Sequence, residues 1–157
     1  MTEKERKYHQ MYMDISERIS QMSFCERLKV GSICVKDGRI ISMGWNGSAA
    51  GLDNVCEYTH YNFKDTDRPI DGAEYTTERK THPSIIHAEA NMLGKLAKYG
   101  ESSNGSTVYI THAPCLECAK TLYVAGVKNI FYKYAYRDNS GVEFLNQFSE
   151  IKVIHFE

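Results

Sequence analysis

The order of apolar and polar positions predicts a chain in which helices and strands alternate. Over residues 4–22, apolar side chains recur every three or four positions, which is the spacing of one face of a helix. Two β-prone runs then flank Asp37-Gly38, a pair that predicts a tight hairpin because both residues must reach positive φ. Downstream, the pattern predicts helices over 86–98, 114–124 and 141–148 and strands over 107–111, 129–134 and 151–156. Pro114 is expected to be the first helical residue of its segment.

Between residues 48 and 83 the periodicity disappears into polar, turn-rich sequence that includes Asp53, Asp67, Pro69 and Gly72. We expect a long loop here, of the kind that is usually functional or disordered. The remaining elements favour an α/β fold, a three-layer α-β-α sandwich with a mixed five-stranded sheet and parallel C-terminal strands. A chain of 157 residues fits one such domain, over 1–157.

Charge and composition narrow the class of protein. The formal net charge is −1, without the basic excess typical of proteins that bind long nucleic acids. The N-terminus is charged and no apolar run approaches the length of a membrane helix, so we expect a cytoplasmic protein without a membrane partner. An odd count of five cysteines without a secretion signal argues against a disulfide framework. Clustered thiols then indicate metal binding, and isolated ones indicate packing.

Two short segments carry candidate chemistry, His87-Ala88-Glu89 and Pro114-Cys115-Leu116-Glu117-Cys118. Both are predicted at helix N-termini. Catalytic zinc takes three protein ligands and leaves a fourth position to water, and His87, Cys115 and Cys118 supply three. Cysteines three residues apart in a first helical turn face the same way, and the helix N-terminus favours their thiolate form.

Glu89 is the expected catalytic residue. Its offset from His87 places its carboxylate beside a zinc-activated water, where it could take the water's proton and pass it to a departing amine. A lone Cys-x-x-Cys is often redox-active or part of a structural zinc site, and a lone His-x-Glu means little. Both halves in order, however, form the signature H-x-E…P-C-x-x-C of zinc deaminases.

The sequence resembles the deoxycytidylate (dCMP) deaminases of the cytidine deaminase superfamily, from about residue 25 to residue 137. The resemblance is carried by the segments VGSICVKDGRIISMGWNGSAAG (30–51), IHAEANML (86–93) and TVYITHAPCLECAKTLYVAGVKNIFY (107–132). The small size and the stretch GWNGSAAGLDNVCEY (44–58) look closest to bacteriophage members, which would place the protein in a host cytoplasm. Trp45 and Ala49 depart from the family, which usually has Tyr and Pro there.

The resemblance implies a zinc-dependent hydrolysis of dCMP to dUMP and ammonia, a step that feeds dTMP synthesis. It implies zinc ligands and a proton shuttle at the residues named above, and substrate contacts at Asn46, Ala88 and Tyr136. Arg27 is expected to contact the phosphate, since a guanidinium matches phosphate geometry. Arg79 and Lys80 compete with Arg27 for that role.

Regulation is also implied by the resemblance. Many deoxycytidylate deaminases are hexamers that dCTP activates and dTTP inhibits, with the effector at subunit contacts near the GWNG loop. The corresponding effector residues here are Gly44, Gly47, Asp53 and Glu57. The two acids could help hold Mg²⁺ on a triphosphate, because that ion prefers oxygen ligands.

Several alternatives stay open. Cys25 and Cys56 could form a second, structural zinc site with His60 or His82, although we expect such isolated cysteines to be packed as small apolar groups. The chain could also deaminate a polynucleotide such as tRNA or another free cytosine nucleotide (dCTP or cytidine), or it could be a non-catalytic zinc nucleotide sensor. The long segment before His87 and the near-neutral charge disfavour the tRNA enzymes, and Glu89 disfavours the sensor.

Overall fold

The N-terminal third forms the predicted helix and hairpin. A computed structural model of the chain describes residues 1–64 and 74–157. Helix α1 (Glu3–Ser20) begins at Thr2, whose side chain accepts the backbone N–H of Glu5 while the Glu5 carboxylate accepts that of Thr2. Strands β1 (Gly31–Lys36) and β2 (Arg39–Trp45) pair around Asp37 and Gly38, whose φ angles are 51° and 74°. The hairpin prediction is confirmed.

The C-terminal half alternates as the periodicity predicted. Its elements are α2 (Ala88–Tyr99), β5 (Thr107–His112), α3 (Leu116–Val124), β6 (Asn129–Tyr134), α4 (Ser140–Leu145) and β7 (Lys152–His155). Three boundaries were wrong by two or three residues: α2 begins at Ala88 instead of 86, α4 ends at Leu145 instead of 148, and the start of α3 also differs. Helix α3 begins at Leu116 with Cys115 as its N-cap, so Pro114 precedes the helix instead of opening it.

The central sheet is mixed and five-stranded, in the order β2-β1-β5-β6-β7. Strand β1 pairs antiparallel with both β2 and β5, whereas β5, β6 and β7 are parallel. The predicted fold class is confirmed, including the parallel C-terminal strands.

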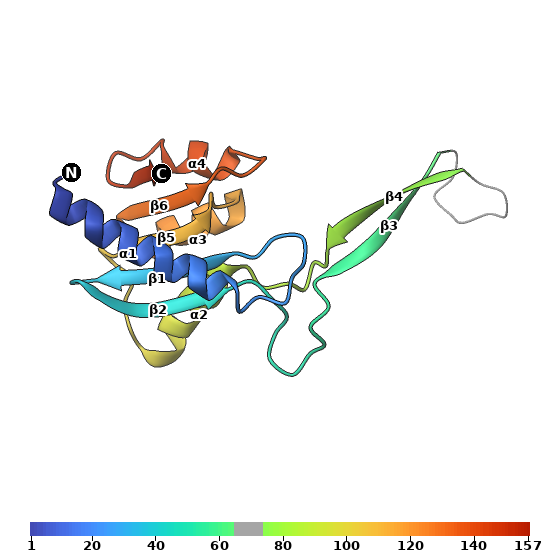
Figure 1. The fold of residues 1–157 in the computed structure, drawn as a ribbon, viewed down its shortest axis with the longest axis horizontal. Coiled ribbons are helices and arrows are strands. Elements are labelled where there is room, and N and C mark those ends of the chain that lie inside the picture. Colours follow the sequence, from blue (N-terminus) through green and yellow to red (C-terminus); the bar gives the residue numbers. More distant parts are fainter. Residues whose placement is uncertain (65–73) are drawn as a thin grey trace.

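Two apolar clusters on opposite faces of the sheet create three layers (Figure 1). Successive side chains of a strand point to opposite faces. Ile33 and Tyr109 pack with α1, while Cys34, Val108 and Ile110 pack with residues of α2, α3 and α4. None of the helices in the described part of the chain combines the length and the apolar content needed to span a bilayer.

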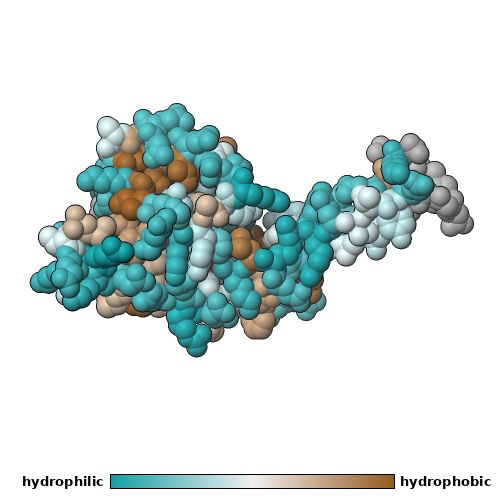
Figure 2. All heavy atoms as spheres, turned by 45° about the horizontal axis from the view of Figure 1, so that its top comes forward, coloured by the Kyte–Doolittle hydropathy of each residue, from teal (hydrophilic) through white to brown (hydrophobic). Residues whose placement is uncertain are grey.

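The expected long loop contains a second sheet, so that prediction was wrong. Strands β3 (Glu57–Phe63) and β4 (Tyr75–Thr81) form a two-stranded antiparallel sheet that projects from the body as an arm (Figure 1). The face of the arm that is visible in Figure 2 is mostly hydrophilic to neutral. The middle of the segment, 65–73, lies outside the described residues, and Asp67, Pro69 and Gly72 with it.

The arm is tied at its base to the segment before β1 by a disulfide between Cys25 and Cys56. Their Cα atoms are 5.1 Å apart, within the range that a disulfide spans. The odd cysteine count predicted no disulfide framework, and that prediction was wrong for this pair. Sulfurs joined in this way do not serve as thiolate ligands of a second zinc. Cys34 is a free, fully buried thiol in β1, packed as expected.

Candidate active site

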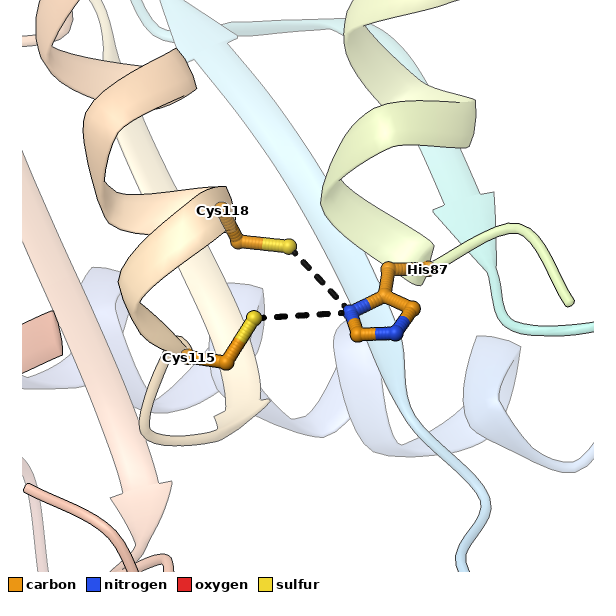
Figure 3. A group of neighbouring side chains, drawn as sticks. All are labelled: His87, Cys115 and Cys118. Carbon is orange, nitrogen blue, oxygen red and sulfur yellow. Dashed lines mark hydrogen bonds between the residues drawn. The ribbon is translucent and has the colours of Figure 1, made fainter. Parts of the chain in front are cut away.

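Two predicted metal ligands occupy the N-cap positions of neighbouring helices. His87 caps α2 and Cys115 caps α3. Helix N-caps are usually Ser, Thr, Asp or Asn, whose side chains bond the free amides of the first turn. Neither His87 nor Cys115 makes such a bond. Their ligand atoms point instead toward each other and toward Cys118, in the first turn of α3 (Figure 3).

The three side chains fit a zinc ion. Their ligand atoms all lie within 4.8 Å of one another, and in the described chain they form the one such group of three or more potential ligands. The Sγ atoms of Cys115 and Cys118 lie 3.6 Å and 3.4 Å from His87 Nδ1. Tetrahedral zinc with ordinary Zn–N and Zn–S bonds separates such atoms by about 3.5 Å.

The thiols differ in their affinity for a proton. A hydrogen bond from Cys118, aided by His87, lowers the pKa of Cys115 to about 4. The same contact, together with burial, raises the pKa of Cys118, and the bond to Cys115 raises that of His87. The lowered pKa favours the thiolate form of Cys115. Cys118 needs a bound cation to favour its thiolate form.

Glu89 lies in the first turn of α2 and is only 5% exposed. Burial raises the pKa of its carboxyl group above the usual range. A carboxylate with a raised pKa accepts a proton more readily than an exposed carboxylate does, as the first step of a proton shuttle requires.

Helix α2 is held closely against the β1–β2 hairpin. The hydroxyl of Ser32 donates to the carbonyl of Ala88 at 2.9 Å, and that of Ser42 donates to the carbonyl of Met92 at 2.8 Å. Gly44 lies against the backbone of Ala88 and Met92, where a Cβ atom would stand 2.3 Å from the oxygen of Ala88. The sheet therefore fixes the distance between α2 and the β1–β2 hairpin, and with it the positions of His87 and Glu89.

A cleft of 620 Å³ opens beside this group. All four predicted substrate residues line it, namely Arg27, Asn46, Ala88 and Tyr136. The cleft reaches from the zinc ligands to the base of the β3–β4 arm. Its size suits a nucleotide-sized ligand.

Asn46 already has two partners within the chain. Its Oδ1 accepts the backbone N–H of Val30 and its Nδ2 donates to the carbonyl of Leu28, both at 2.8 Å. The carboxamide retains one N–H and one lone pair. Asn46 therefore fixes the wall of the cleft whatever else it contacts.

The cleft-lining cations fall into two classes. Arg79 pairs with Glu26 at 2.9 Å, and Lys80 pairs with Glu78. Among the described residues, Arg27 and Arg137 have no carboxylate within 4.0 Å. Of the three phosphate candidates named from the sequence, Arg27 is the one that remains unpaired.

His112 and the arm also form parts of the cleft, which the sequence did not predict. His112 ends β5 and lines the cleft, and burial lowers its pKa. Its place at the carboxyl end of a strand, just before Cys115, was the available signal.

The four predicted effector residues have different surroundings. Gly44 is buried beneath α2, and Gly47 pairs with Ile86 in an isolated β-bridge. Asp53 is exposed, whereas the side chain of Glu57 is only 4% exposed and lies on the cleft. Effector and Mg²⁺ binding at these residues stays a prediction.

Comparison with known proteins identifies the family. The profile described as "Cytidine and deoxycytidylate deaminase zinc-binding region" matches residues 6–134. The chain belongs to this deaminase family. Deaminase activity, predicted from the signature, is confirmed, as is the resemblance to phage deoxycytidylate deaminases. The family's zinc-binding character agrees with the His/Cys/Cys group.

Several of the similar proteins are phage enzymes. The deoxycytidylate deaminase of Enterobacteria phage T4 is 34% identical, over 81% of this chain and 78% of its own length. That of Mycobacterium phage D29 is 30% identical, over 80% and 93%. The crystal structure of dCMP deaminase from cyanophage S-TIM5, in complex with dCMP and dUMP, superposes with a TM-score of 0.78 at 36% identity, covering 99% of this chain and 98% of that one.

Proposed function

We propose that this deaminase converts dCMP to dUMP with release of ammonia. The observation that carries the proposal is a buried carboxylate, Glu89, beside a His/Cys/Cys group in a cleft. The rim of this cleft holds the guanidinium of Arg27, which has no carboxylate partner within the described part of the chain. A cytosine base fits at the metal end and a phosphate at the arginine end. Similarity over nearly the whole chain to a protein solved with dCMP and dUMP supports this substrate.

His87, Cys115 and Cys118 would hold the zinc ion. Bound there, zinc supplies Lewis-acid activation of the attacking water. The carboxylate of Glu89 accepts the water's proton and delivers it to the departing exocyclic amine. Because burial raises the pKa of Glu89, its carboxylate accepts that proton more readily than an exposed carboxylate would.

The remaining substrate contacts follow from the walls of the cleft. Ala88 lies between the metal-binding residue His87 and Glu89, is fully buried, and forms part of the wall of the cleft. Tyr136 offers an aromatic face for the nucleotide to pack against, and Asn46 offers its spare N–H to the sugar.

A substrate panel tests the proposal. We expect ammonia release from dCMP with a kcat/KM well above that for deoxycytidine, dCTP or CMP. A preference for deoxycytidine would show that no phosphate site operates, and turnover of none of the four would refute the proposed function.

The proton shuttle is tested by Glu89→Gln, which keeps the shape of the side chain but cannot accept a proton. We expect the zinc content to remain and kcat to fall by about 10²-fold or more. Normal turnover by this variant would exclude the mechanism.

We further propose a homo-oligomer, a hexamer by resemblance, that dCTP activates and dTTP inhibits. A sigmoidal dependence of rate on dCMP that becomes hyperbolic with dCTP would support this regulation. Indifference to both triphosphates, with and without Mg²⁺, would exclude it.

A further inference from the structure

Glu57 makes contacts that its predicted effector role does not explain. It opens strand β3, and its side chain is 4% exposed on the wall of the cleft. Its Oε1 accepts two backbone N–H groups, from Glu26 at 3.1 Å and from Arg27 at 3.0 Å. A carboxylate that is withdrawn from water needs such partners, and backbone amides bind it strongly.

These bonds fix the backbone of the residue that carries the unpaired guanidinium. Arg27 Nη1 lies 3.4 Å from the hydroxyl of Thr81, which stands opposite Glu57 in the β3–β4 ladder. The base of the arm therefore holds Arg27 both at its backbone and near its tip.

A second set of contacts locks the same two segments together. Arg79, on β4, donates to Glu26 at 2.9 Å and lies 3.9 Å from the other oxygen of Glu57. The disulfide joins the residues that precede Glu26 and Glu57. Arg79 is thus occupied in supporting the segment, which leaves Arg27 to face the cleft.

We infer that Glu57 is a positioning residue for phosphate recognition: its buried carboxylate holds the backbone of Glu26 and Arg27 so that the Arg27 guanidinium can receive the phosphate of dCMP. The inference rests on the proposed function, because it requires a nucleoside monophosphate substrate. It assigns the base of the β3–β4 arm to substrate selection.

Charge alone predicts the opposite effect. A carboxylate on the wall of a phosphate site repels the phosphate, so its removal should lower the KM for dCMP. If Glu57 instead positions Arg27, its removal weakens phosphate binding and raises KM. The sign of the change in KM separates the two roles.

The experiment compares Glu57→Gln with Glu78→Gln. Glu78 lines the same cleft, but its side chain is 49% exposed and pairs with Lys80 at 2.6 Å. Both variants remove one negative charge from the same wall and keep the side-chain volume. They differ in whether the lost carboxylate holds the backbone of Arg27.

We expect Glu57→Gln to raise the KM for dCMP by about tenfold, because the neutral amide oxygen would hold the two backbone N–H groups less strongly than the carboxylate does. The kcat should stay within about twofold of the wild-type value. Glu78→Gln should show no rise in KM. In an Arg27→Ala background, Glu57→Gln should add little further to KM, because the guanidinium that it positions is gone.

Three results would overturn the inference. They are an unchanged or lowered KM in Glu57→Gln, an equal rise in the Arg27→Ala background, and loss of the native far-UV circular dichroism spectrum, which would make Glu57 a residue of folding. Failure of the proposed function looks different, because the wild-type protein itself would then release no ammonia from dCMP.

Discussion

The close approach of α2 to the sheet makes Gly44 a test of how the fold positions the site. In Gly44→Ala, the new Cβ would lie 2.3 Å from the carbonyl oxygen of Ala88 and 2.5 Å from the backbone nitrogen of Met92. Ordinary contact begins at 3.4 Å, so the first atom is about 1 Å too close. Both neighbours are backbone atoms, which cannot rotate away. The helix must therefore move.

The cost has a thermodynamic and a catalytic part. Overpacking of this kind costs about 1–3 kcal/mol, and the loss of unfolded-state entropy on replacing glycine offsets about 0.4–1 kcal/mol. We expect the free energy of unfolding to fall by about 1–2 kcal/mol in net terms. Moving α2 also shifts His87 and Glu89, and a misplacement of about 1 Å can lower kcat by about 10²-fold.

Urea unfolding and the rate of dCMP deamination measure the two parts. Gly47→Ala is the matched control, because a Cβ there meets no heavy atom within 4 Å. The control should unfold within about 0.5 kcal/mol of the wild-type protein. If Gly44→Ala matches the wild type in both stability and kcat, the sheet does not fix the position of α2 and therefore does not position His87 and Glu89.

Three further predictions follow from single residues. Gly94→Ala, on the exposed side of α2 with no atom near its Cβ, should raise the free energy of unfolding by about 0.5–1 kcal/mol in urea titrations, and a loss of stability would contradict the surroundings described for it. Cys118→Ser should reduce the zinc content from about one ion per chain and abolish ammonia release, whereas full occupancy by elemental analysis would remove Cys118 from the ligand set. Burial lowers the pKa of His9 below its unfolded value of 6.5, so the unfolded state binds more protons and the free energy of unfolding should decline as pH falls through 6.5. His9→Phe, which keeps the stacking on Phe131, should flatten that decline, and an unchanged slope would show that other groups cause it.

The amino-acid sequence determined those parts of the protein that depend on neighbouring residues. The period of α1, the Asp37-Gly38 turn and the spacing from Cys115 to Cys118 are set by helix and turn geometry over a few residues. A strand with one buried face is recognised by alternating apolar and polar residues, and a strand with two buried faces by a short apolar run. Strands β1 and β5 are of the second kind, because apolar clusters cover both of their faces.

The β3–β4 arm was not predicted, because the apolar pattern that identifies a strand in a sequence arises from burial. Most of its residues are exposed, so its sequence carries no apolar alternation. The polar composition that suggested a loop belongs instead to a hairpin that solvent reaches on both faces.

Only the tertiary structure decided which of the three phosphate candidates named from the sequence lacks a carboxylate partner among the described residues. Arg27, Arg79 and Lys80 are equivalent candidates along the chain, and the partner of Arg79, Glu26, lies on a segment that the fold brings beside β4. The contact from Glu57 to Arg27 spans 30 positions, and the bond from Asn46 to Val30 spans 16. Short-range periodicity carries no information about such pairs, because they depend on strand register and on how the arm meets the body.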